Sequence, residues 1–149
     1  MQSSVEQVAK TNAGLASALR VSVSRLFRRI RSERDPENQL SVGQVAVLAA
    51  LKREGDCTIS QLARQERVQP PSMTRTVTLL EEGGYVHRKD HPDDGRQVLV
   101  CLAEKGEKTL ALDRSRRDVW LALRLAELTS EERAVLRRAA PILERLGAG

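Results

Sequence analysis

One stretch, residues 58–102, constrains the fold of this 149-residue chain more than any other. Two short amphipathic patterns come first, separated by the polar and proline-rich segment Arg67–Pro71. Gly83–Gly84 ends the second pattern, and two strand-like runs follow, joined by the polar turn His91–Gly95. Prolines favour the first turn of a helix, and Asp-Gly favours a hairpin turn. The order helix, turn, helix, hairpin predicts a winged helix-turn-helix over residues 41–102, which can place one helix in a DNA groove.

Helix starts elsewhere are marked by capping boxes, in which a Ser or Thr and a Glu or Gln three residues later satisfy orphan amides. These pairs are Ser41 with Gln44, Thr58 with Gln61, and Thr129 with Glu132. Apolar spacing predicts one long helix over residues 4–34 and another over residues 104–128. In the last helix, Pro141 is expected to cause a bend or an interruption.

The second helix of the motif has two distinct faces. At 100° per residue, Met73, Val77 and Leu80 form a core stripe. The opposite face carries small polar groups and one arginine: Pro71, Ser72, Thr74, Arg75 and Thr78. Small side chains allow close approach to a major groove, and an arginine can bind guanine through two hydrogen bonds. A solvent-exposed helix is the alternative, but the neighbouring capped helix and hairpin favour the DNA-binding interpretation.

Further candidate DNA contacts lie at the start of the first motif helix and on the hairpin. The hydroxyls of Thr58 and Ser60 lie where helix amides can bind a phosphate, although capping alone also explains them. Lys89, His91 and Arg96 supply donors near the hairpin tip, and Arg96 can enter a minor groove. Asp94 is expected to hold the Arg96 guanidinium, either for DNA or as an ion pair that rigidifies the turn.

Charge alone does not identify the partner. The chain carries a net charge of +5 and has a pI near 9.8, which fits a polyanion such as DNA. Residues 57–102, however, hold six basic and six acidic side chains. Any DNA specificity must therefore come from the placement of a few groups. The arginines in the second half of residues 4–34 form a solvated helix face or, alternatively, reach phosphates.

The terminal helices, residues 4–34 and 104–147, are more apolar than the central motif can cover. We therefore expect them to pack against a second copy and to form a homodimer. Twofold symmetry would then place two recognition helices about 34 Å apart on DNA. The predicted fold is mainly α, with a small β-hairpin wing, inside a single domain covering residues 1–149.

Three segments together resemble the MarR family of winged-helix transcription regulators: Leu40–Leu51, Ile59–Arg88 and His91–Glu107, the last with its Asp94-Gly95-Arg96 element. The resemblance implies a homodimeric repressor that binds a palindromic operator in double-stranded DNA and releases it when a small phenolic or anionic effector binds. On the matching positions, Ser72, Thr74 and Arg75 would meet bases or phosphates, and Arg96 would enter the minor groove. Gln69 and Pro71 would lie at the groove edge.

The chain also departs from that family pattern. The run Leu102–Gly106 lacks the threonine that usually caps the next helix, and Gly106 weakens its first turn, so a looser helix start is expected. The first helix lacks the cysteine of the peroxide-sensing branch.

Other chemistry has little support in the sequence. His87 and His91 have no cysteine or acidic cluster to complete a metal site, so no metal or cofactor is expected. No nucleophile–base arrangement points to an enzyme. Cys57 precedes a helix start, which can lower a thiol pKa, and Trp120 is a weak candidate for lining an effector pocket. The absence of a signal-like or membrane-spanning run predicts a cytoplasmic protein.

Two other functions remain open at this stage. The near-neutral motif would also suit a winged-helix protein-interaction module without operator-specific DNA binding. A DNA-binding protein that responds to no ligand would share every residue named above.

Overall fold

The computed structural model describes residues 2–148, and it separates them into two compact units. The central unit comprises Arg34–Ser115. The terminal unit comprises the described residues up to Glu33 and those from Arg116 onward. Helix α6 (Glu104–Ala126) begins in the central unit and continues into the terminal unit.

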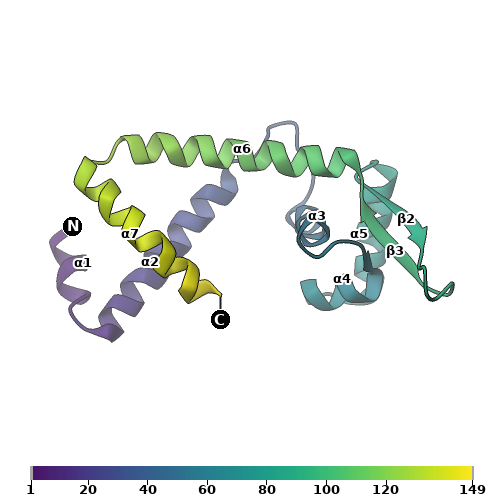
Figure 1. Ribbon diagram of the computed structural model, residues 1–149, viewed down its shortest axis with the longest axis horizontal. Helices are drawn as coiled ribbons and strands as arrows, with labels where there is room; N and C mark the ends of the chain where they lie inside the picture. The colour runs from purple at the N-terminus through teal and green to yellow at the C-terminus, as the bar shows by residue number, and fades with distance from the viewer. Residues whose placement is uncertain (1, 149) are drawn as a thin grey trace. The chain divides into compact units, whose positions relative to one another are not determined.

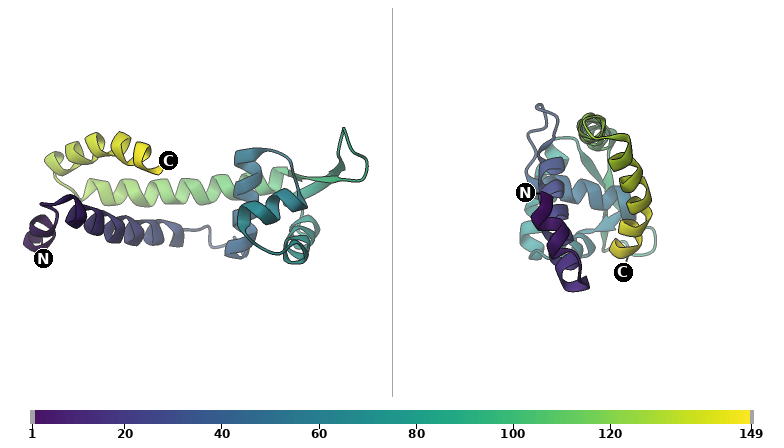
Figure 2. Two further views of the ribbon diagram at one scale, coloured as in Figure 1. Left: turned by 90° about the horizontal axis from the view of Figure 1, so that it is seen from below. Right: turned by 90° about the vertical axis from the view of Figure 1, so that its left-hand side faces the viewer.

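The central unit is a winged helix-turn-helix, as predicted (Figure 1). Its helices are α3 (Val42–Glu54), α4 (Ile59–Glu66) and α5 (Pro70–Glu82). Its antiparallel sheet has the order β1-β3-β2, formed by β1 (Cys57–Thr58), β3 (Val98–Leu102) and β2 (Val86–Asp90). The loop that joins β2 to β3 projects away from α3, α4 and α5 (Figure 2).

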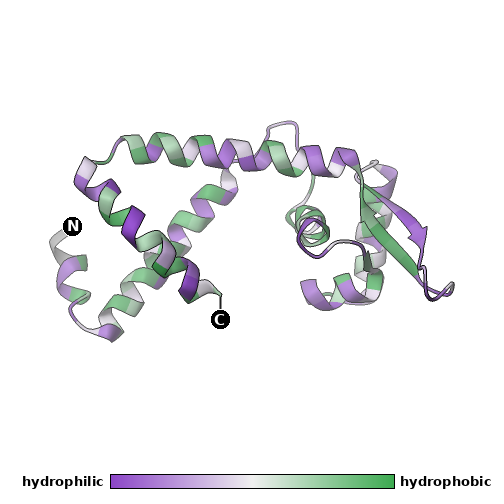
Figure 3. Cartoon of the chain, in the orientation of Figure 1, coloured by the Kyte–Doolittle hydropathy of each residue, from purple (hydrophilic) through white to green (hydrophobic). Residues whose placement is uncertain are grey.

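Strand β1 was not expected from the sequence, which placed only a helix start at residue 58. Two residues are too short for a recognisable alternation pattern. Cys57 nevertheless pairs with Val100 and Thr58 with Leu99, so β3 becomes the central strand. Figure 3 shows β3 as hydrophobic and β2 as largely hydrophilic, in agreement with their positions.

The core of the central unit joins all three helices to the sheet. Its most deeply buried side chains include Val47 and Leu48 of α3, Leu62 of α4, Met73, Val77 and Leu80 of α5, and Val100 of β3. The predicted core stripe of α5 is thereby confirmed. All three predicted capping boxes are also present, with both reciprocal hydrogen bonds in each.

The terminal unit contains α1 (Gln2–Val8), α2 (Asn12–Ser32), the end of α6 and α7 (Ser130–Gly147). The prediction of one helix over residues 4–34 was wrong. Thr11 starts a new helix because its hydroxyl accepts a hydrogen bond from the Gly14 amide at 3.1 Å. A Cβ on Gly14 would lie 1.7 Å from the Val8 carbonyl oxygen, so this turn requires glycine.

Helices α2 and α7 contain no buried residue. Hydrophobic residues recur along both helices (Figure 3). Several of their side chains are exposed, including those of Leu26, Phe27, Leu136 and Leu143. Helix α7 continues through Pro141 without interruption. Among the helices of residues 2–148, none is long and apolar enough to cross a membrane.

The start of α6 is tightly held, contrary to the looser start expected from the missing threonine. The Ala103 amide donates to the Tyr85 carbonyl at 3.0 Å. The Lys105 ammonium lies 4.4 Å from the centre of the Tyr85 ring and donates to the Gly83 carbonyl at 2.7 Å. Gly106 is buried against the same backbone, so its lack of a side chain permits a close approach.

We predict that Gly106→Ala destabilises the protein. The added Cβ would lie 2.4 Å from the Tyr85 carbonyl oxygen and 2.7 Å from Leu102 Cδ1, so the backbone must shift. The expected loss in free energy of unfolding is about 1–3 kcal/mol, measured by urea denaturation. Gly43→Ala in α3 is the matched control, because the nearest atom to its Cβ is 4.0 Å away. Equal stability of the two variants would contradict the close-approach argument.

Candidate nucleic-acid interface

The outer face of α5 presents the polar groups expected from the helical wheel. Ser72, Thr74 and Arg75 are exposed, whereas Met73 of the core stripe is only 2% exposed. No described residue forms a hydrogen bond or ion pair with the Arg75 guanidinium. It is therefore available to an external acceptor and already lies on an ordered helix.

The threonines of α5 have a defined hydrogen-bonding polarity. The Thr74 hydroxyl donates to the Pro70 carbonyl at 3.0 Å, and the Thr76 hydroxyl donates to the Ser72 carbonyl at 3.0 Å. Because its proton is used within the helix, Thr74 presents a methyl group and an acceptor oxygen to its surroundings. Those groups are complementary to a thymine methyl or to an exocyclic amine of adenine or cytosine.

Thr78 is half-buried and has an internal role. Its hydroxyl donates to the Thr74 carbonyl at 2.9 Å and accepts from Arg88 Nη2 at 3.1 Å. Arg88 Nε also lies 3.5 Å from Glu81 Oε2. These contacts attach strand β2 to the second half of α5 and fix the hairpin beside the helix. A DNA contact by Thr78 stays a prediction.

Sequence analysis missed Arg88. A signal was present, because Arg88 shares one strand face with Val86, two residues earlier, and Val86 is 2% exposed. The Arg88 side chain stays partly exposed, and its guanidinium reaches Thr78 and Glu81 of the neighbouring helix.

Four predicted site residues gather around one hollow between the start of α4 and the hairpin. Thr58, Ser60, His91 and Arg96 line this hollow of about 460 Å³. Gln61, Arg64 and Gln97 complete its polar wall. A second hollow of about 600 Å³ is lined by Ser60, Arg64, Arg67 and Gln69, among others. Arg64, absent from the sequence-based site, lies in the wall of both hollows; its position four residues after Ser60 on one helix face was the available signal.

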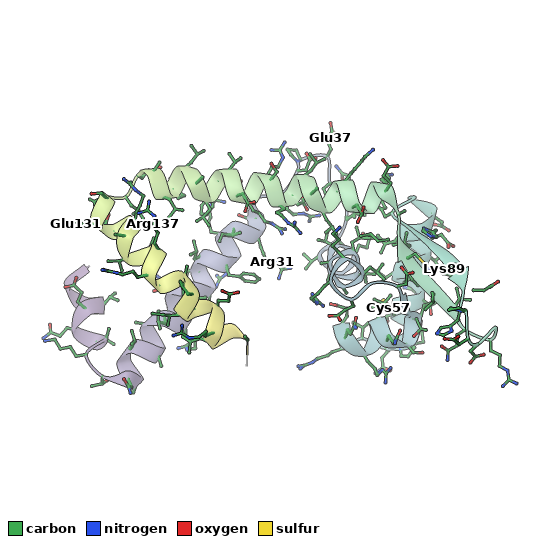
Figure 4. The ribbon with its side chains drawn as sticks, viewed as in Figure 1. Arg31, Glu37, Cys57, Lys89, Glu131 and Arg137 are labelled. Carbon is green, nitrogen blue, oxygen red and sulfur yellow. The ribbon has the colours of Figure 1, made fainter. Side chains whose placement is uncertain are left out.

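Two predictions about the hairpin need correction. Asp94 Oδ1 accepts a hydrogen bond from the Arg96 backbone amide at 3.0 Å and does not pair with its guanidinium. The turn is thus rigidified through the backbone, and the Arg96 side chain has no partner among residues 2–148. The Lys89 ammonium is also not free to act as a donor near the hairpin tip, because it lies 2.5 Å from Asp56 Oδ2. Lys89 is labelled in Figure 4. A contact of Lys89 with DNA would have to compete with this pair.

The Asp56–Lys89 pair shifts the pKa of both side chains. The hydrogen bond from Lys89 lowers the pKa of Asp56, and the hydrogen bond to Asp56 raises the pKa of Lys89. Both residues therefore remain charged across the neutral pH range. Their link joins the β2 strand to the segment just before β1.

Comparison with known proteins identifies this architecture. The family model described as the MarR family matches residues 40–98. An uncharacterised HTH-type transcriptional regulator of Mycobacterium bovis, Mb0904, is 45% identical over 133 residues, which cover 89% of this chain and 92% of the relative. The chain belongs to the MarR family. It is accordingly a transcriptional regulator and not an enzyme.

Other relatives and solved structures extend the similarity. The HTH-type transcriptional repressor MdtR of Bacillus subtilis is 29% identical over 79% of this chain and 78% of its own. A solved transcriptional regulator protein of Pseudomonas aeruginosa is 34% identical, with a TM-score of 0.77 over 93% of this chain and 96% of the other. A variant of MepR from S. aureus, solved with a bound oligodeoxyribonucleotide, shares the fold at 16% identity and a TM-score of 0.67, over 90% and 96% of the two chains.

The two cysteines of this MarR-family protein are not activated. Cys57 is 4% exposed and Cys101 is 3% exposed. Burial raises the pKa of both thiols, and the nearby carboxylate of Asp56 raises them further, together with Glu54 in the case of Cys57. The lowered thiol pKa considered for Cys57 is therefore wrong, because desolvation outweighs the helix start. No group of three or more metal-binding side chains occurs within residues 2–148.

Trp120 lies in an arginine-rich setting in the terminal unit. The Arg29 and Arg124 guanidinium carbons lie 5.0 Å and 5.8 Å from the centre of its ring. Its indole Nε1 is buried and has no hydrogen-bond partner among the described residues. A role of Trp120 in binding an effector stays a prediction.

We predict that both thiols of the MarR-family protein resist alkylation in the folded state. A raised pKa leaves a smaller thiolate fraction at pH 7, and burial blocks access to it. Iodoacetamide labelling followed by mass spectrometry should modify Cys57 and Cys101 rapidly in urea and slowly without it. Rapid labelling of Cys57 in the native protein would show that the thiol is exposed and reactive.

Proposed function

We propose that this protein is a homodimeric, sequence-specific repressor that binds a palindromic operator in double-stranded DNA and is released by a small phenolic or anionic ligand. One observation carries most of the proposal: Arg75 is unpaired on the outer face of a core-anchored helix, in the same unit as two hollows whose walls include Arg64 and, in one of them, Arg96. Such an arrangement pairs one group suited to base recognition with several suited to phosphates.

Within the proposed complex, α5 enters the major groove. Arg75 donates two hydrogen bonds to a guanine, and Thr74 contributes its methyl group and acceptor oxygen. Ser72 has an exposed hydroxyl on the same face. Gln69 and Pro71 come at the start of the helix and lie at the groove edge. Thr78 supports this face through Arg88.

Phosphate binding is assigned to the hollow between α4 and the hairpin. The positive end of the α4 helix dipole attracts an anion, as do the side chains of Arg64, His91 and Arg96. Arg96 extends from the rigid turn into the minor groove. This arrangement explains how a segment with equal numbers of basic and acidic side chains can bind a polyanion.

The dimer is assigned to the terminal helices, residues 4–34 and 104–147, of a single MarR-like domain spanning residues 1–149. The supporting observation is that large apolar side chains of α2 and α7 are exposed; Figure 3 colours the hydrophobic residues along both helices. Covering such a surface removes apolar area from water, which is the main favourable term in association. Repression is supported by the name of the relative MdtR, and DNA binding by the bound oligonucleotide of MepR.

For the proposed release by an effector, Trp120 is the candidate contact. Trp120, with its unpartnered Nε1 and neighbouring arginines, supplies donors and an aromatic surface for an aromatic anion. A cytoplasmic location follows from the proposed contact with DNA.

The second candidate is a winged-helix protein-interaction module, favoured by the neutral charge balance of residues 57–102. Binding of the purified protein to randomised DNA at low salt separates the two functions. Selection of a palindrome supports the repressor, and absence of any DNA binding supports the interaction module.

We predict that the protein sediments as a dimer and that Leu143→Asp shifts it towards the monomer. Leu143 is 41% exposed on α7, and a buried carboxylate at a dimer interface would lack a partner. Sedimentation velocity measures the mass of each species. Glu144→Lys, at an exposed neighbouring position, is the charge-changing control. A wild-type mass of one chain at micromolar concentration would contradict the proposed dimer.

We predict that Arg75→Ala weakens binding to the selected operator by about 1–3 kcal/mol, or about five- to 150-fold in Kd. The loss should be confined to operators that carry the contacted guanine. Fluorescence anisotropy with matched operator and substituted operator measures both effects.

Two further variants make the Arg75 result interpretable. Arg53→Ala removes an exposed arginine of α3 that pairs with Glu54, and it should leave operator affinity unchanged. Arg96→Ala should weaken binding and reduce its salt dependence, because it removes a cation that the negative potential of the DNA backbone attracts into the minor groove. Full operator affinity in a folded Arg75→Ala protein would remove this residue from recognition.

A further inference from the structure

Asp113 of α6 is a buried carboxylate whose described partners all come from one connecting segment. Only 1% of its surface is exposed, and it is the sole buried charged residue among those whose burial the structure describes. Its Oδ1 accepts from the Asp35 amide at 2.9 Å, and its Oδ2 accepts from Asn38 Nδ2 at 2.8 Å. Arg34 Nε lies 3.9 Å from Oδ2, close enough for an ion pair without a hydrogen bond.

The connecting segment, residues 34–40, also has hydrogen bonds between its own residues. Arg34 Nη2 donates to the Leu40 carbonyl at 2.7 Å, and the Leu40 amide donates to Asn38 Oδ1 at 3.0 Å. Leu40 then joins the hydrophobic core of the central unit. The exposed side chain of Glu37 points away from the rest of the protein (Figure 4). Asp113 and this segment are together called the Asp113 clasp.

The position of the Asp113 clasp along the chain is informative. The chain passes between the terminal and central units at two points, after Glu33 and after Ser115. The partners of Asp113 begin immediately after the first point, and Asp113 itself lies two residues before the second. One carboxylate therefore ties together the two chain segments that lead out of the central unit.

We propose that Asp113 is a positioning residue that sets which half-site spacing the dimer accepts, an inference that rests on the proposed function. In a dimer held by the terminal helices, each α5 would be connected to its twin only through these two segments. A rigid connection narrows the range of separations between the recognition helices. It thereby raises the effective concentration of the second helix at the correct half-site and lowers it elsewhere.

A purely stabilising role for Asp113 makes a different prediction. Loss of a structural contact would change the fold of the central unit, and it would weaken binding to one half-site and to a palindrome in parallel. A positioning role leaves half-site affinity intact and changes only the advantage of the palindrome. Spacing preference is therefore the readout that separates the two roles.

The experiment uses the full-length protein and a palindrome selected from random DNA by the wild type. Affinities are measured for one half-site, for the palindrome, and for palindromes with one base pair inserted or removed at the centre. Each such change moves the second half-site by about 3.4 Å along the DNA axis. The wild type should lose at least about tenfold in affinity on altered spacing.

Asp113→Asn replaces one acceptor by a donor that faces the Asn38 amide or the Asp35 amide. We expect half-site affinity within about twofold of the wild type and a loss of about tenfold on the native palindrome. The penalty for altered spacing should shrink at the same time.

A charge-swapped variant provides the matched rescue. Asp113→Asn combined with Asn38→Asp exchanges donor and acceptor across the 2.8 Å bond and keeps the net charge. The amide oxygen at position 113 can still accept from the Asp35 amide, and the carboxylate at position 38 can still accept from the Leu40 amide. This double variant should recover the wild-type spacing profile. If Asp113→Asn does not fold, Asn38→Ala removes only the side-chain bonds of Asn38 and carries the same test.

The outcomes separate the inference from the function on which it rests. An unchanged spacing profile in Asp113→Asn overturns the inference, and so does an equal loss on half-site and palindrome. Failure of the wild type to select any palindrome refutes the proposed function, and the inference falls with it. A flattened profile that the charge swap restores supports both.

Discussion

Burial of one stripe of α5 is the constraint on which the rest of the structure depends. Met73, Val77 and Leu80 pack into the core shared by α3, α4 and β3. Because a helix has fixed angular spacing, this packing determines that Ser72, Thr74 and Arg75 face outward. The same core also fixes where the sheet lies, and thus where the hairpin begins. The polar outer face that we propose contacts DNA is therefore a consequence of the apolar packing beneath it.

Polar contacts then refine what packing leaves open. Arg88 attaches the hairpin to α5 through Thr78 and Glu81, and Asp94 holds the turn through the Arg96 amide. Thr78 and Asp94, which the sequence assigned to DNA, therefore both form hydrogen bonds within the protein. Both arginines that the sequence assigned to DNA, Arg75 and Arg96, form no side-chain hydrogen bond or ion pair with any of residues 2–148. A surface with few free cations depends strongly on their placement, which fits the neutral charge of residues 57–102.

The two units differ in how much apolar surface they bury on their own. The central unit buries a complete core, whereas α2 and α7 bury no residue and leave many large apolar side chains exposed. A proposed dimer resolves this difference, since apolar surface of that kind requires a partner. The Asp113 clasp joins the two chain segments that lead from the central unit towards the terminal unit.

The sequence by itself determined the helices and the hairpin of the central unit, the capping boxes and the inward stripe of α5, because these depend on local chemistry and on periodicity. It also carried the family resemblance that the relatives confirm. Only the tertiary structure decided the pairing of Cys57 with Val100, the pKa of the cysteines and the partners of Arg88, Lys89 and Asp113. Those features join residues distant along the chain, and burial and hydrogen-bond geometry have no periodic signature in one sequence. The break after Val8 was missed for a related reason: Thr11 and Gly14 act through a contact with the preceding turn that helical spacing does not show.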